Sequence, residues 1–231
     1  MSECCVSVKD LSMSYGRGDA LKGVSFQLEA GTLVALTGAN GSGKSTLLKI
    51  LAGFIQTYRG EASILGQRDT WLTKSEVCFH PSYPWFKPGQ RVSDAVKMYA
   101  ALRPGYRVAE ADELFGRFGF DMSARLGTLS KGRLALALFI LSMGVNARVY
   151  LLDEPFGGID IKTRDEMREV LLRQADERRL FLIATHELSD MERLFDRFIL
   201  LDHGRIALDG QSDDLREQYG CSIAELMRRK L

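Results

Sequence analysis

Gly38-Ala39-Asn40-Gly41-Ser42-Gly43-Lys44-Ser45-Thr46 fits the pattern G-x-x-x-x-G-K-[ST] without a substitution. The apolar run 33–37 before it is typical of a strand buried on both faces, and residues 47–52 after it favour a helix that ends at Gly53. Strand, glycine-rich loop and helix together form a phosphate cradle, because the glycines let backbone N–H groups turn inward and the helix N-terminus adds partial positive charge. A chance glycine-rich turn is the alternative, and the two flanking elements argue against it.

The loop predicts a nucleotide site with a metal ion. We expect the ammonium of Lys44 to reach the β- and γ-phosphates and to take part in catalysis, and the hydroxyl of Ser45 to ligate Mg²⁺. The predicted nucleotide-binding residues of this loop are Gly38, Asn40, Gly41, Ser42, Gly43, Lys44, Ser45 and Thr46.

Composition sets limits on the class of protein. The chain has 231 residues, 31 Lys and Arg against 30 Asp and Glu, and a net charge of +1, so no nucleic acid is expected as a partner. The four cysteines lack metal-ligand spacing, which indicates reduced thiols in a cytosolic protein. The N-terminus has no signal pattern, and the longest apolar run, 134–144, is too short to span a bilayer. We therefore expect a soluble chain whose membrane role, if any, comes through another polypeptide.

The N-terminal region favours an antiparallel sheet ahead of the phosphate loop. Apolar and polar residues alternate at Val6 and Val8, and again at Val24, Phe26 and Leu28, as in half-buried strands. Tyr15 lies between the two predicted strands. It could stack on an adenine ring, or it could be an ordinary turn residue, and the local sequence does not decide between the two.

A helical insertion follows two further predicted strands, 60–66 and 76–79. A proline-broken loop carries Tyr83, Trp85 and Phe86, which suggests a lid or a docking surface for a partner. Ser93 is the expected N-cap of a helix that runs to about Leu102, and residues 109–118 predict a second helix. Residues 83–130 thus form the predicted insertion.

Two acids follow the buried strand 149–152 at the carboxyl edge of a parallel sheet, where ligands of such sheets bind. Adjacent strand residues point to opposite sides, so Asp153 and Glu154 are expected to have different roles. Asp153 would hold Mg²⁺ through water, and Glu154 would polarise the attacking water, a contribution of roughly 10²- to 10⁴-fold.

His186 follows the predicted strand 180–185 at the same edge, which favours a γ-phosphate contact over the structural role usual for a lone histidine. His80 and His203 lack this setting, and residues 202–205 predict a hairpin turn between strands 198–201 and 205–208. The turn 129–133 opens an apolar helix, in which Ser130 could be merely an N-cap.

Taken in order, these motifs resemble the ATPase subunit of ABC transporters over essentially the whole chain. The resemblance rests on an aromatic before the core (Tyr15), the phosphate loop 38–46, the signature turn 129–133, the pair Asp153-Glu154, an Asp-loop at 157–160 and the switch histidine His186. Order and spacing together are more specific than any single motif.

The resemblance implies an α/β fold of the P-loop NTPase, RecA-like kind with a mainly parallel sheet. One ABC ATPase domain would span residues 1–231, with an N-terminal antiparallel β-subdomain from about 1–30, a core at 31–82 and 131–231, and an inserted α-helical subdomain at 83–130.

It also implies a head-to-tail homodimer with two composite sites that bind ATP and Mg²⁺ and hydrolyse ATP. Ser130 and the Gly132 backbone would touch the γ-phosphate held by the other copy, and Asp160 would couple the two sites. The partner would be a separate transmembrane permease, docked on Tyr83, Trp85 and Phe86, with the chain peripheral on the inner face of the cell membrane.

Three departures from the family pattern stand out. Lys131 and Arg133 replace the third and fifth signature residues, and residues 134–136 are apolar where the family often has polar ones. Ser82 occupies the position of a glutamine that senses Mg²⁺. A serine is too short for that contact, which leaves water mediation or substitution by His80.

The subtype and the alternatives follow from the same residues. The chain is expected to lack a C-terminal regulatory domain and a fused membrane segment, and it has a lysine in the signature. In these respects it is similar to stand-alone ATPases of type-two ABC exporters. A soluble ABC-type ATPase acting on nucleic acid or the ribosome usually carries a long coiled coil or tandem cores, which this sequence lacks. A small-molecule P-loop kinase would leave the signature turn and His186 without roles.

Overall fold

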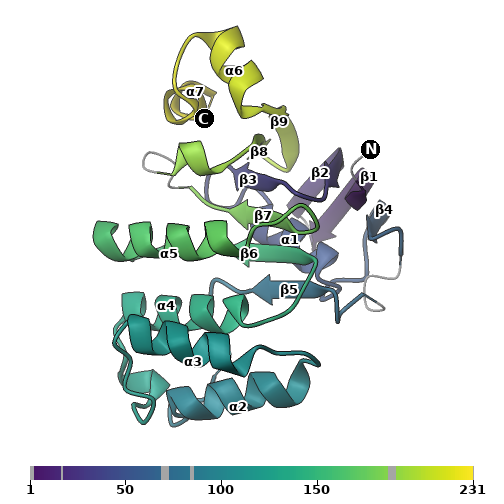
Figure 1. Cartoon of the computed structure of the whole chain (residues 1–231). Helices are drawn as coiled ribbons and strands as arrows, with labels where there is room; N and C mark the ends of the chain where they lie inside the picture. Colours follow the sequence, from purple (N-terminus) through teal and green to yellow (C-terminus); the bar gives the residue numbers. More distant parts are fainter. Residues whose placement is uncertain (1–2, 17, 69–72, 84–85, 187–190, 231) are drawn as a thin grey trace.

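A six-stranded sheet forms the centre of the computed structural model, which describes residues 3–16, 18–68, 73–83, 86–186 and 191–230 (Figure 1). The first five strands in spatial order run parallel, and the sixth is antiparallel to its neighbour. In that order the strands are β5 (Val77–His80), β6 (Val149–Asp153), β7 (Leu180–Ala184), β3 (Leu33–Thr37), β8 (Arg197–Asp202) and β9 (Arg205–Gln211).

A second, three-stranded antiparallel sheet contains β1 (Cys4–Tyr15), β2 (Gly18–Glu29) and β4 (Arg59–Ile64), with β1 in the middle. Val8 of β1 lies opposite Phe26 of β2 and Ala62 of β4. The predicted antiparallel sheet is therefore confirmed, and the strand expected at 60–66 belongs to it.

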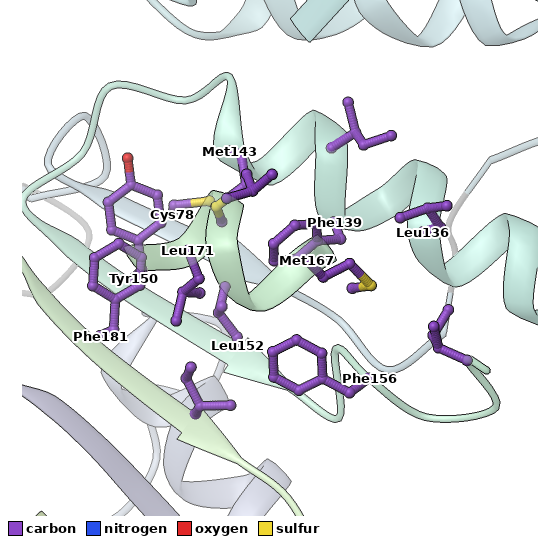
Figure 2. Close-up of a cluster of buried hydrophobic side chains, with 14 of the residues drawn as sticks. Cys78, Leu136, Phe139, Met143, Tyr150, Leu152, Phe156, Met167, Leu171 and Phe181 are labelled. Atoms are coloured by element: carbon purple, nitrogen blue, oxygen red, sulfur yellow. The ribbon is translucent and has the colours of Figure 1, made fainter. Parts of the chain in front are cut away.

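Two hydrophobic cores lie on the two faces of the central sheet, because its parallel strands are apolar at nearly all positions except their ends. In β3, Val34 and Leu36 join the core shared with the three-stranded sheet, whereas Ala35 joins the core on the other face. Figure 2 shows part of this second core, where the rings of Tyr150 and Phe181 stack with centroids 4.4 Å apart. Burial on both faces holds the carboxyl edge of the sheet in a fixed position.

The helices divide between those that pack on the central sheet and those that extend from it. In Figure 1, α2 and α3 lie beside α4 on the side away from the sheet, so they form the expected helical insertion. The α-helices are α1 (Lys44–Leu51), α2 (Val92–Leu102), α3 (Val108–Arg117), α4 (Lys131–Met143), α5 (Ile161–Gln174), α6 (Ser212–Tyr219) and α7 (Ile223–Lys230), with short 3₁₀ turns at Leu126–Thr128 and Glu192–Leu194.

The predicted fold class is confirmed, while two local predictions were wrong. Helix α1 begins at Lys44 rather than Leu47, since the end of the phosphate loop is already helical. The N-cap of α2 is Arg91 rather than Ser93, because the Arg91 amide donates to Asp94 Oδ2 at 3.0 Å and starts the helix two residues earlier. None of the helices in the described ranges has the length and apolar character needed to cross a membrane.

Candidate functional site

The phosphate loop is pressed against the backbone of its neighbours, which explains two of its glycines. A Cβ added at Gly38, whose φ is +144°, would lie 2.1 Å from the Leu201 carbonyl oxygen. A Cβ at Gly43, whose φ is +111°, would lie 2.5 Å from the Ala20 carbonyl oxygen. No L side chain fits either position, so the loop conformation depends on glycine.

Lys44 is buried at the base of the loop, and its ammonium folds back onto the loop itself. Its Nζ donates to the Gly38 carbonyl at 2.7 Å and to the Ala39 carbonyl at 3.1 Å. Burial lowers the pKa of Lys44, and the carboxylates of Glu154 and Asp153 partly oppose that shift. A cation in this position is well placed to bind an anion in the cradle.

Asp153 is the last residue of β6 and is only 1% exposed. Within the described ranges neither of its carboxylate oxygens has a hydrogen-bond partner. A buried carboxylate without partners is costly unless a cation satisfies it, so this position fits a hydrated Mg²⁺. No three His, Cys, Asp or Glu side chains of the described residues are grouped to hold a metal by themselves, so further ligands must come from outside this set.

Glu154 diverges from Asp153 because the backbone turns, which corrects the expected explanation. Its φ is +50°, in the left-handed region, so the two acids do not follow the alternation of a strand. Its amide donates to the Ala184 carbonyl at 2.9 Å. Its Oε1 lies 2.8 Å from Nδ1 of His186, so the structure brings the acid and the histidine together as a hydrogen-bonded pair.

A cavity of about 860 Å³ connects the phosphate loop with the loop after β5 and with helix α4. Tyr15 lines it and is 55% exposed, a position that suits an aromatic ring stacking on a ligand. Tyr15 is also the last residue of β1, paired with Gly18 across the hairpin, so both interpretations of this tyrosine remain compatible with the fold. The loop residues Asn40, Gly41, Gly43, Lys44, Ser45 and Thr46 line the cavity together with Ser82 and Glu154.

His80 also lines the cavity, although the sequence analysis did not expect it to share the setting of His186 and considered it only as a substitute for the missing glutamine. Its Nδ1 lies 3.1 Å from Ser142 Oγ, and that hydroxyl donates to the Leu138 carbonyl at 2.9 Å. Burial lowers the pKa of His80 to about 4, with the Leu138 carbonyl opposing, so the ring is neutral at pH 7. The sequence contained a signal for this position, because His80 ends a buried strand, β5, at the same sheet edge as Asp153.

The signature residues lie at the start of α4; Lys131 lines this cavity, whereas Ser130 and Gly132 do not. Ser130 is the N-cap, and its Oγ accepts a hydrogen bond from the Arg133 amide at 3.3 Å. A Cβ on Gly132 would lie 2.7 Å from the Gly158 carbonyl oxygen, so the signature turn packs against the Asp-loop. Asp160 caps α5 through the Thr163 amide at 3.0 Å, and this bond lowers the pKa of Asp160.

The remaining predicted residues fall into three places. Ser42 Oγ is buried inside the loop without a hydrogen-bond partner in the described part of the chain. His203 lies in the exposed β8–β9 turn, as predicted. Trp85 lies outside the described residues.

Comparisons with known proteins agree with this geometry. The family model described as ABC transporter matches residues 21–157. A probable metal transport system ATP-binding protein of Chlamydia trachomatis is 31% identical over 94% of this chain and 90% of its own length. The aliphatic sulfonates import ATP-binding protein SsuB 1 of Rhizobium johnstonii is 33% identical over 88% of this chain and 76% of its own length.

A solved structure of the ATP-binding subunit of an ABC transporter superposes with a TM-score of 0.87 at 28% identity, covering 98% of this chain and 99% of that chain. The resemblance inferred from the motifs is thereby confirmed. The chain belongs to the ABC transporter family, as an ATP-binding subunit that hydrolyses ATP to power transport and works with a separate transmembrane permease.

Proposed function

We propose that two copies of this chain hold two Mg-ATP molecules, each between the phosphate loop of one copy and the signature turn 129–133 of the other. In this arrangement Lys44 binds phosphate oxygens, Ser45 and Asp153 hold Mg²⁺, and Glu154 polarises the attacking water. The metal neutralises phosphate charge when it is bound. The 2.8 Å contact between His186 and Glu154 supports a paired role in which the histidine orients the acid and contacts the γ-phosphate.

One observation supports coupling between ATP hydrolysis and transport. The short segment that contains Pro81 and Tyr83 borders both the ATP cavity and a second, apolar groove. Pro81 and Tyr83 line both the 860 Å³ cavity and a hollow of about 190 Å³ that includes Phe54 and Phe79. When ATP next to Ser82 binds or is hydrolysed, the adjacent residues Pro81 and Tyr83 would move, and these residues also line the groove.

The groove has the chemistry of a docking site for a helix of the membrane partner. Phe54 and Phe79 continue from the first hollow into a second one of about 220 Å³. Basic side chains border the two hollows, so an amphipathic helix with apolar anchors and an acidic residue is the matching occupant. The basic lining residues are Lys49, Lys74 and Arg103, and the other lining residues are mainly apolar, among them Val77, Met98 and Leu102.

The docking surface that we propose differs in part from the one expected from sequence. Tyr83 is 84% exposed at the groove, whereas Phe86 packs inward on Tyr99 with ring centroids 6.4 Å apart. Phe54, which the sequence interpretation did not single out, is 57% exposed and lies in both hollows. We therefore place the partner on Phe54 and Tyr83 and the chain on the inner face of the membrane.

We further propose that the transporter exports its substrate. Lys131 in the signature favours an exporter, as the sequence suggests. Import is the second candidate, because a relative is named for aliphatic sulfonates import. ATP-driven uptake of a substrate into inverted membrane vesicles, against uptake into right-side-out cells, distinguishes the two directions.

The docking site is tested with the double variant Phe54→Ser, Tyr83→Ser. We expect its ATP-stimulated cosedimentation with inverted membrane vesicles to fall about tenfold or more, since two apolar anchors are lost. Protease treatment of the vesicles should abolish binding of the unaltered chain, because the receptor is a protein.

The matched control is Leu172→Ser on α5, another exposed apolar residue. It should bind vesicles and ATP like the unaltered chain. Because Tyr83 also lines the ATP cavity, the ATP affinity of the double variant is measured separately, and all three proteins are compared at saturating ATP. Unchanged cosedimentation of the double variant would rule out the groove as the docking site.

A further inference from the structure

Arg133, in the first turn of α4, reaches back to the turn that follows α3. Its Nη1 donates to the Phe118 carbonyl at 2.7 Å, and its Nη2 donates to the Gly119 carbonyl at 2.9 Å. Its Cζ lies 3.7 Å from the centroid of the Phe120 ring. One guanidinium thus makes three contacts with three consecutive residues.

The charges of the two helices explain this geometry. A cation in the first turn of a helix is disfavoured by the helix dipole, and α4 has no acidic residue in its first turn to compensate. Phe118 is the C-cap of α3, where backbone carbonyls carry partial negative charge. Arg133 therefore points its charge away from its own helix and onto the end of α3, and its planar fork suits two carbonyls and a ring face at once.

The same turn of α4 is held from a second direction. Gly132 packs so closely on Gly158 that only a glycine fits there. The Asp-loop carbonyl of Ile159 accepts a hydrogen bond from Arg164 Nη2 at 3.2 Å, which anchors this loop to α5. The first turn of α4 is therefore clamped between the 118–120 turn and the Asp-loop.

The clamp determines how Ser130 is presented. Its Oγ accepts from the Arg133 amide, which uses a lone pair of the hydroxyl and leaves the proton for an acceptor outside this contact. Any rotation of the first turn changes the direction of this hydroxyl and of the neighbouring Gly132 amide together.

We infer that Arg133 is a positioning residue of the composite ATP site: its guanidinium fixes the first turn of α4 so that Ser130 and Gly132 meet the nucleotide held by a second copy of the chain. This inference rests on the proposed dimer. We expect Arg133 to affect dimer closure rather than ATP binding by a single chain, because none of its contacts involves the phosphate loop.

The test measures ATP-dependent dimerisation of the variant Glu154→Gln, in which ATP persists, with and without Arg133→Gln. We expect Arg133→Gln to raise the dimer dissociation constant about tenfold, while the affinity of the monomer for ATP changes less than twofold. With Glu154 intact, the protein concentration for half-maximal ATPase activity should rise by a similar factor.

Two further variants separate positioning from general stability. Arg133→Lys keeps the charge without the fork and should restore part of the lost dimerisation. Phe120→Leu leaves α4 unchanged but removes the ring under the guanidinium, so dimerisation should weaken a few-fold. Arg117→Gln is the control, because Arg117 lies on α3 and pairs with Glu169 at 3.0 Å, and it should dimerise like the parent.

The outcomes distinguish failure of the proposed dimer from failure of the role assigned to Arg133. A parent Glu154→Gln that stays monomeric with saturating ATP overturns the proposed dimer and this inference together. A dimerising parent with an equally dimerising Arg133→Gln overturns the inference alone. Equal losses of monomer ATP affinity and of dimerisation in Arg133→Gln would show a general structural role and would also overturn it.

Discussion

The phosphate loop and the signature turn bind opposite sides of a nucleotide in the proposed dimer, and this chain builds them in different ways. Backbone atoms of neighbouring strands hold the loop, and a Cβ at Gly38 or Gly43 would overlap with them. In the signature turn, Gly132 is likewise pressed against the Gly158 carbonyl, but the contact with the turn after α3 is made by one long side chain, that of Arg133. A site held by backbone accepts few residue types, whereas a site held by a side chain can be rebuilt with another side chain.

This difference matches the places where the sequence departs from the family pattern. The loop 38–46 fits its pattern at every position, while the signature turn has Lys131 and Arg133 at two of five positions. Arg133 has a structural account in the α3–α4 contact. Lys131 lines the 860 Å³ cavity, and nothing else in the structure explains it.

The largest expected effect is on ATP turnover, at the side of the nucleotide that the phosphate loop binds. Glu154→Gln should lower ATP turnover by roughly 10²- to 10⁴-fold, because an amide cannot act as a general base. ATP binding should remain, and a dimer should accumulate that is detectable by size-exclusion chromatography with light scattering.

The control for this variant is Glu166→Gln on α5, whose carboxylate pairs loosely with Arg117 at 3.9 Å. It should turn over ATP normally. Normal turnover by a monomeric Glu154→Gln would mean that the base is assigned to the wrong residue.

Lys44→Ala tests whether the loop binds phosphate through its cation. We expect the affinity for ATP to fall about 100-fold, since charge-assisted hydrogen bonds to phosphate are lost. Isothermal titration calorimetry measures this directly, with Lys49→Ala of the same helix as the control. ATP affinity equal to that of the unaltered chain would show that the cradle is misassigned.

A pair of glycine variants tests whether backbone contact holds the loop. Gly38→Ala should lower the free energy of unfolding by about 3 kcal/mol or more, because its Cβ overlaps with a backbone carbonyl. Gly41→Ala should cost only about 1 kcal/mol, because Gly41 has a φ of +83° but nothing within 4 Å of its Cβ position. Urea unfolding compares the two, and equal losses would remove the backbone explanation.

The smallest expected effect is on the alkylation rate of Cys78, which reports how tightly the helices next to β5 pack on the central sheet. Cys78 of β5 is buried beneath the apolar groove, and burial raises the pKa of its thiol to about 11, with Arg103 opposing. The thiolate is the reactive form, so alkylation at pH 8 should be slow and should rise about tenfold per pH unit up to pH ~11. Mass spectrometry of alkylated peptides follows the reaction, with the exposed Cys4 as an internal control. Labelling of Cys78 as fast as Cys4 at pH 8 would show that this side opens readily.

The core could be predicted from sequence because its signals are local. The apolar runs of β3, β6 and β7 and the glycine spacing of the loop each lie within a few consecutive residues, and parallel strands bring their ends to one edge. For the same reason Asp153 and His186 could be placed at that edge before the structure was known.

The remaining features depend on contacts between distant segments. The positive φ of Glu154, the hydrogen bond between His80 and Ser142 and the contact of Arg133 with Phe118 leave no periodic pattern in the sequence. The wrong N-cap for α2 has the same origin, because Ser93 donates its amide to the distant Met122 carbonyl at 3.0 Å and lies inside the helix.

The inward fold of Lys44 has a consequence for which molecules can enter the cradle. Its ammonium already has two neutral acceptors, the carbonyls of Gly38 and Ala39, so an incoming ligand must compete with the loop for the same protons. A polyphosphate wins that competition by its charge, whereas an uncharged nucleoside gains nothing from the exchange. The loop is thus a filter for anions before any contact with the base contributes to recognition.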